Sequence, residues 1–272
     1  MSYAAELGSP VRDPAAVARS QRRGILRETL IVLGVSLGAS AIWSILQIIE
    51  KLTRNVPLRA QTTTMNSSVT PDRPWLDLAY QLVGIGLALV PVVLAIYLLG
   101  RVLRPAEGVR PTAFLGLDRT RPGKDLLAGL GLAAVIGIPG LGLYLLARQL
   151  GINTNVAAAN LTAVWWSGPV LALAAIQNAV LEEVVMVGYL FTRWRQIGWS
   201  WPAVLVGSAV IRGSYHLYQG FGGFVGNLAM GLILGLFFLR RRRVMPLVVC
   251  HSVLDIVAFV GYTVLRSRGI SL

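Results

Sequence analysis

The sequence is poor in charged residues, in histidine and in cysteine, and these shortages exclude several classes of protein. Charged residues make up 14% of the 272 residues, whereas hydrophobic residues make up 55% and the mean hydropathy is +0.65. This composition is typical of an integral membrane protein. The single cysteine, Cys250, excludes a disulfide within the chain. The P-loop, CxxC and HExxH patterns are all missing, which excludes the common nucleoside triphosphatase and zincin sites.

The net charge of +13 does not indicate a nucleic-acid partner. The basic residues flank hydrophobic segments instead of covering one face of a soluble domain. In a membrane protein, such residues set the topology and attract anionic lipids. We therefore expect the lipid bilayer, and no nucleic acid, among the partners of this chain.

Long apolar segments predict an all-α fold, a polytopic transmembrane bundle of seven helices. A membrane span needs about 20 residues, so the segment 202–218 is short for one, although Pro202 can begin it. An eighth helix would require 155–166 to re-enter the membrane, but Trp165 and Trp166 favour a position in the interface. The seven segments lie near 29–49, 76–100, 126–149, 168–191, 202–218, 222–239 and 244–266.

The distribution of lysine and arginine predicts a cytoplasmic N-terminus. With seven spans, 17 of these 25 residues fall on the N-terminal side of the membrane and 7 on the other, while Arg212 lies within a helix. We expect a multi-pass protein of the bacterial inner membrane, with a flexible polar loop at 52–75.

Three regions follow from this organisation. Residues 1–28 are expected to form a polar, basic cytoplasmic tail, and 29–150 to supply N-terminal transmembrane helices and loops. Residues 151–272 are expected to form a transmembrane core that carries a Glu-Glu pair, a histidine and a His-x-x-x-Asp pattern. The two histidines of the chain both lie in this third region.

Five acidic or histidine side chains lie in the apolar segments of the core, where they are costly. An ionisable group at the centre of a membrane helix costs about 2.5–3.5 kcal/mol, so such groups usually face partners or water. We hypothesise that they form one site that opens to the cytoplasmic side. Its members are Glu182, Glu183, His216, His251 and Asp255.

Helix geometry constrains how these residues can meet. His251 and Asp255 are four residues apart, so both lie on one face about 6 Å apart, where they either line a pocket or form a packing hydrogen bond. Glu182 and Glu183 diverge by about 100° and cannot both face one centre without distortion. One glutamate is therefore expected to be a catalytic or ligand group, and the other to be a structural partner of a neighbouring residue. Arg212 needs an anion, and we expect it to pair with Glu183 and leave Glu182 free.

Three motifs, in chain order, resemble those of the CPBP family of intramembrane proteases, also called the CAAX prenyl endopeptidase or Abi family. That family has EExxxR, FxxxH and HxxxN/D motifs within a core of four helices, and the resemblance covers about residues 168–260. The corresponding segments are 182–187, 212–216 and 251–255. Val187 stands where the family has arginine, and Arg212 stands where it has phenylalanine, so Arg212 could supply the same charge from the neighbouring helix.

The resemblance implies roles for these residues. Glu182 would be the general base that activates water, and Asp255 would stabilise the oxyanion or orient His251. His216 and His251 would bind a metal or polarise the scissile carbonyl. Two chemical routes stay open: an open zinc site made by His216, His251 and Glu182, and a metal-free route in which a histidine donates to the oxyanion.

The function expected from these residues is an intramembrane endopeptidase of the CAAX prenyl protease type. Its substrate would be a membrane-associated protein or peptide, with or without a lipid modification. Two other readings remain: a non-catalytic scaffold or immunity-type protein, favoured by the missing arginine at Val187, and a proton-coupled transporter. Replacement of Glu182 by Gln discriminates among the three.

Overall fold

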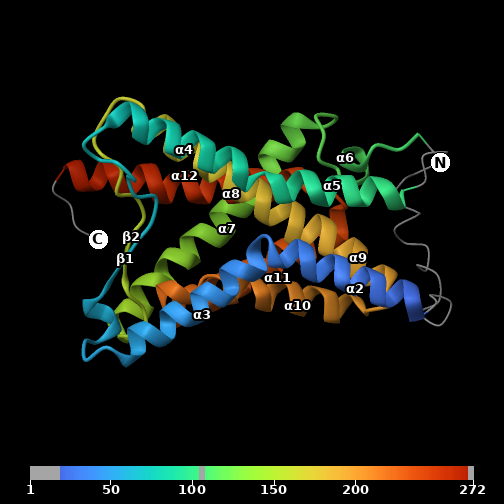
Figure 1. The fold of residues 1–272 in the computed structure, drawn as a ribbon, viewed down its shortest axis with the longest axis horizontal. Helices are drawn as coiled ribbons and strands as arrows, with labels where there is room; N and C mark the ends of the chain where they lie inside the picture. The colour runs from blue at the N-terminus through green and yellow to red at the C-terminus, as the bar shows by residue number, and fades with distance from the viewer. Residues whose placement is uncertain (1–18, 104–107, 269–272) are drawn as a thin grey trace.

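The fold is an all-α helical bundle, as predicted (Figure 1). The computed structural model describes residues 19–103 and 108–268, so most of the predicted tail, 1–28, lies outside the described residues. The first half of the chain supplies α2 (Arg19–Gly34), α3 (Leu37–Thr53), α4 (Pro74–Ala88), α5 (Val90–Val102), α6 (Pro111–Phe114) and α7 (Pro122–Gln149). The second half supplies α8 (Ser167–Glu182), the π-helix η4 (Glu183–Tyr189), α9 (Leu190–Gln196), α10 (Trp201–Ser214), the short 3₁₀ helix η5 (Leu217–Gln219), α11 (Phe221–Arg241) and α12 (Met245–Ser267).

The number of long spans differs from the predicted seven. Within the described residues, five helical stretches are long and apolar enough to cross a membrane, and α2 with α3, bent by 57°, makes a sixth if counted as one. The predicted span at 202–218 corresponds to α10, whose 14 residues rise about 21 Å, less than the hydrocarbon core of about 30 Å. The segment 155–166, which was considered as an eighth span, forms no helix.

The segment that follows α10 is irregular and connects it to α11. After Ser214 the chain passes through η5 to Gly220, which bridges to Asn153. Gly220 has a φ of 118°, and a Cβ there would lie 2.6 Å from the Ile152 carbonyl oxygen, so this turn requires glycine. His216 therefore lies in a turn between helices and not within a continuous span.

Two polar loops cap one end of the bundle. The strands β1 (Thr62–Thr64) and β2 (Asn155–Ala157) pair in parallel, and Figure 1 shows them near the C-terminal end of α12. The Thr63 and Thr154 hydroxyls are 2.7 Å apart. The prediction of a flexible loop at 52–75 was therefore wrong, because its polar groups find partners about 90 residues away in the chain.

Buried ion pairs tie helices together at the opposite end. Arg193 on α9 donates two hydrogen bonds to Glu28 on α2, at 2.8 and 2.6 Å. Arg243 binds Asp125 and Asp118, which fixes the turn between α11 and α12. Burial raises the pKa of Asp118, but its hydrogen bonds with Arg243 and Thr120 outweigh this effect and lower the pKa to about 2.

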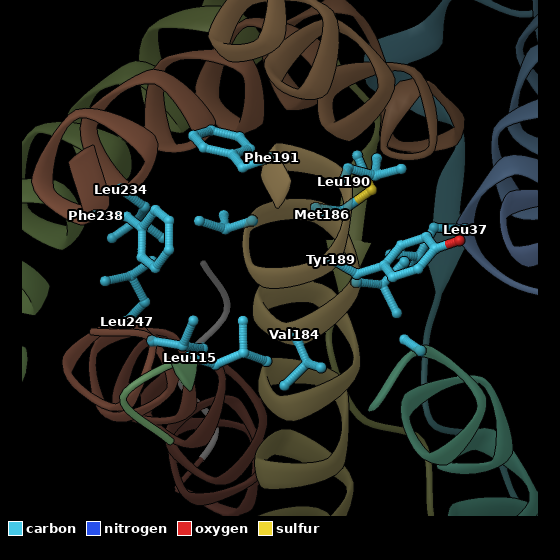
Figure 2. Packing of buried hydrophobic residues seen from close by; sticks show 14 of the residues in the cluster. Leu37, Leu115, Val184, Met186, Tyr189, Leu190, Phe191, Leu234, Phe238 and Leu247 are labelled. Atoms are coloured by element: carbon cyan, nitrogen blue, oxygen red, sulfur yellow. The ribbon is translucent and has the colours of Figure 1, made fainter. Parts of the chain in front are cut away.

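The continuous helix formed by α8, η4 and α9 runs through the centre of the bundle. All seven residues of η4 are buried. Figure 2 shows its side chains spreading to opposite sides, with Tyr189 near Leu37 and Phe191 near Phe238. The rings of Phe191 and Phe238 meet edge to face, with centroids 5.8 Å apart. Helices α2, α5, α11 and α12 thus pack around the element that carries Glu182 and Glu183.

Gly129 controls the packing of α7 on α12. A Cβ at Gly129 would lie 2.5 Å from Val249 Cγ1 and 2.9 Å from the Pro246 carbonyl oxygen, whereas a Cβ at Gly131 would meet nothing within 4 Å. We predict that Gly129→Ala lowers the free energy of unfolding by about 1–3 kcal/mol, because α12 must move away. Thermal unfolding in detergent measures this effect. Gly131→Ala is the control, and equal midpoints for the two variants would contradict the packing described here.

Candidate active site

Glu182 and Glu183 lie where the central helix changes its winding. Glu182 ends α8, and Glu183 begins the π-helix η4, whose wider turns bring successive side chains closer in direction than those of an α-helix. Both carboxylates face Arg212 and His251. Adjacent glutamates were expected to share a centre only in a distorted helix, and the winding of this helix does change at Glu183.

Glu183 is held on two sides inside the protein. Its side chain is fully buried, and its Oε1 atom lies 2.7 Å from Arg212 Nη2 and 2.8 Å from His251 Nδ1. Arg212 is itself only 1% exposed. The predicted ion pair of Arg212 with Glu183 is therefore present, and it joins α10, α8–η4 and α12 at one point.

Glu182 faces both histidines of the chain. Its Oε2 atom accepts a hydrogen bond of 2.6 Å from the Tyr215 hydroxyl, so it is not as free as expected. Its Oε1 atom lies 3.8 Å from His216 Nε2, and its Oε2 atom lies 4.0 Å from His251 Nε2. These two distances are too long for direct hydrogen bonds and short enough for one water to bridge. Arg212 Nη1 lies 3.8 Å from the same carboxylate.

The hydrogen-bond partners assign opposite tautomers to the two histidines. A carboxylate only accepts, so His251 Nδ1 carries a proton and donates it to Glu183. At His216, the Gln219 amide nitrogen lies 3.4 Å from Nδ1 and donates to it, which leaves the proton on Nε2. Within the described residues, no protein group hydrogen-bonds to that buried Nε2 atom. An N–H donor is thus aimed at the space beside Glu182.

Asp255 completes the cluster from the same helix as His251. Its Oδ1 atom lies 3.8 Å from His251 Nε2, so the four-residue spacing places both side chains in one site, as predicted. Three carboxylates then face the single permanent cation Arg212.

The structure adds two residues, Tyr215 and Gln219, to the predicted site. Tyr215 follows the last residue of α10, and its ring lies 4.9 Å from that of His216. Neighbouring residues of a helix point about 100° apart, so Tyr215 and His216 reach the same site only because the helix has ended. Gln219 reaches His216 from η5. No periodicity in the sequence marks where α10 stops.

The donor atoms do not fit a zinc ion in this arrangement. Two ligands about 2.1 Å from one tetrahedral zinc lie about 3.4 Å apart, whereas the histidine nitrogens lie 3.8 and 4.0 Å from the Glu182 oxygens. Among the described residues, no three His, Cys, Asp or Glu side chains are grouped so that they could hold a metal ion. The predicted set of His216, His251 and Glu182 would have to move to bind one.

A cavity of about 520 Å³ lies beside the site. Tyr215 and Tyr218 form one wall, α3 forms another, and β1 closes its end. This position is at the β1 end of the bundle, opposite the first residues of α2 (Figure 1). We expected an opening toward the predicted cytoplasmic side, so the position of this cavity differs from that prediction.

Comparison with known proteins agrees with the motifs. The family model described as "Rce1-like: Type II CAAX prenyl endopeptidase Rce1-like" matches residues 164–257, about a third of the chain. The match contains all three motifs, and it confirms the resemblance to CAAX prenyl endopeptidases. It supports an intramembrane CAAX-type endopeptidase fold for this part of the chain. No curated protein and no solved structure matches the chain.

The buried position of Arg212 makes a prediction about stability. Arg212→Met leaves Glu183 without its cation, and loss of one partner of a buried pair costs about 3–5 kcal/mol. Thermal unfolding in detergent should show a lower midpoint, and Arg212→Lys, which keeps the charge, should lose less. Arg240→Met, at an exposed position, is the control for loss of one positive charge. A midpoint for Arg212→Met equal to that control would show that Glu183 does not depend on Arg212.

Proposed function

We propose that this chain is an intramembrane endopeptidase that hydrolyses a peptide bond of a membrane-associated protein or peptide with water activated by Glu182. The observation that carries the proposal is the position of the Glu182 carboxylate. It faces the Nε2 atoms of both histidines at distances that one water can bridge. The match to the CAAX prenyl endopeptidase family over these residues supports the same reading.

The proposed reaction needs only groups of this chain. Glu182 takes a proton from the bridging water, and the water oxygen forms a bond with the scissile carbonyl carbon. The carbonyl oxygen becomes an oxyanion, which accepts a hydrogen bond from His216 Nε2–H. When the carbon–nitrogen bond breaks, Glu182 returns the proton to the leaving amine. Atoms and charges balance, and each product carries a new terminus.

The remaining polar residues would position these groups. Glu183 fixes the His251 ring through Nδ1, and Arg212 balances the charge of Glu183. Asp255 faces the other nitrogen of His251. His251 Nε2 then points toward Glu182, where it can orient the water. Gln219 keeps the proton of His216 on the nitrogen that faces Glu182.

We further propose that the chain lies in a bacterial inner membrane with its N-terminus in the cytoplasm. Five or six long apolar helices within the described residues make it an integral, multi-pass membrane protein. The asymmetry of 17 against 7 basic residues supports the orientation. Substrates embedded in the bilayer would reach Glu182 laterally, between helices, since the site lies within the bundle.

Replacement of Glu182 tests the proposal directly. We predict that Glu182→Gln abolishes cleavage, because an amide cannot accept the proton of water, while the similar shape preserves folding. The measurement compares peptide termini in membranes from cells that express the wild type or the variant at equal levels. New C-termini should appear with the wild type only. Glu50→Gln, at an exposed position on α3, is the matched control and should behave as the wild type.

The opposite results separate the alternative functions. Identical peptide termini in membranes with the wild type, Glu182→Gln and Glu50→Gln would contradict the protease. If Glu182→Gln also rescued a deletion phenotype, the result would favour a non-catalytic scaffold. Identical termini combined with a changed proton flux would point to a transporter, because acid and histidine chains also serve as proton relays.

The donor geometry predicts that cleavage does not require a metal. Purified protein treated with a strong chelator should keep its cleavage rate within about twofold, because the proposed steps pass through Glu182 and His216 alone. Elemental analysis of the same sample should show far less than one metal ion per chain. Loss of cleavage on chelation and its recovery with zinc would instead assign His216, His251 and Glu182 as ligands.

A further inference from the structure

The cavity beside the site contains a lysine, Lys51, that has no carboxylate partner among the described residues. We call it the α3 cavity and define it by Ser40, Ser44, Gln47, Lys51, Tyr215 and Tyr218, together with the threonines of β1. Lys51 donates to the Thr63 hydroxyl at 2.6 Å and to the Tyr218 carbonyl. An ammonium group has three donors, so one is left for a ligand.

No carboxylate among the described residues lies within ion-pair distance of Lys51. The neighbouring Glu50 pairs with Arg54 on the outside of α3. Lysines near helix ends often extend to water at the membrane surface, but the Lys51 ammonium turns inward to Thr63, which is 5% exposed. The hydrogen-bond partners of this ammonium group are the neutral oxygens of Thr63 and Tyr218, so an anionic ligand would add a stronger, charge-assisted hydrogen bond. The chemistry of the α3 cavity therefore calls for a negatively charged group.

An apolar groove adjoins the α3 cavity at Ser40. This second hollow, of about 470 Å³, lies where α2 bends into α3 and α4 breaks into α5. Ser40 lines both hollows. The groove is otherwise mostly apolar, with Val35, Leu87, Pro91, Leu94 and Leu181 among its lining residues. A ligand that fills both hollows must be charged at one end and apolar at the other.

The length of this path matches one leaflet of a bilayer. Ser40 and Lys51 are eleven residues apart on α3, which corresponds to about 16 Å at 1.5 Å per residue. That is about half of the hydrocarbon core of roughly 30 Å. A phosphate at Lys51 thus lies at the level of the headgroups, and its acyl chain reaches the groove near the bilayer midplane.

We propose that the α3 cavity and the apolar groove together bind one anionic phospholipid, with its phosphate on Lys51 and the hydroxyls of β1 and with an acyl chain in the groove. Tyr215 separates this lipid from Glu182, since its ring lines the cavity and its hydroxyl binds the carboxylate. The lipid site does not depend on the proposed proteolysis, and it would remain if the chain were a scaffold.

Retention of lipid by the purified protein tests this site. The protein is exchanged into vesicles of equal parts phosphatidylglycerol and phosphatidylcholine, extracted in mild detergent and examined by native mass spectrometry. We expect one retained phosphatidylglycerol, favoured about tenfold or more over phosphatidylcholine, as charge-assisted hydrogen bonds allow. Lys51→Met should lose this preference, and Lys51→Arg should keep it.

Lys124→Met is the matched control, because Lys124 is the other lysine of the chain and lies exposed on α7. It removes the same charge and should retain the lipid. The proposal would be overturned if the wild type showed no preference for phosphatidylglycerol, or if Lys51→Met kept that preference. The first of these results does not depend on whether any variant folds. Millimolar inorganic phosphate should not displace the lipid. Displacement would assign the site to free phosphate instead.

Discussion

The ion pair of Glu183 with Arg212 is the interaction on which the site depends. Both groups are buried, and each offsets the desolvation of the other; His251 also donates to Glu183, and the Glu182 carboxylate also lies near Arg212. The pair fixes the distance between α8–η4 and α10, and through His251 it includes α12. It also neutralises one of the two adjacent carboxylates. Glu182 is thereby left to face His216 and His251, which is the arrangement that water activation requires.

Irregular backbone places the reactive groups. The π-helix η4 begins at Glu183, and α10 ends two residues before His216. Helical distortions of this kind lower backbone stability and are found at functional sites more often than elsewhere. Here each has an identifiable effect: η4 brings the two carboxylates to one centre, and the end of α10 lets Tyr215 and His216 share it. The regular helices around them supply packing, such as the contact between Phe191 and Phe238.

Much of this site could be predicted from the sequence, because charges in apolar segments are costly and must meet. The cost of buried charge predicts the pairing of Arg212 with Glu183, and it predicts a site made by Glu182, Glu183, Arg212, His216, His251 and Asp255. Sequence reasoning could not find Gln219 or Tyr215, since their roles depend on where α10 ends. It also treated 52–75 as a flexible loop, because parallel pairing with residues far along the chain leaves no local signal. Seven spans were expected for a similar reason: apolar composition does not show that α10 stops after 14 residues.

The central claim is that the two histidines carry their protons on different ring nitrogens, so that each has a different role beside Glu182. Nitrogen-15 NMR of histidine-labelled protein tests this claim most directly. The chain has two histidines, so the spectrum contains two imidazoles, and His216→Gln assigns them by removing one. The account predicts that His251 is protonated at Nδ1, through its bond to Glu183, and that His216 is protonated at Nε2 with a bare Nδ1. A bare Nδ1 on His251, or a bare Nε2 on His216, would contradict it.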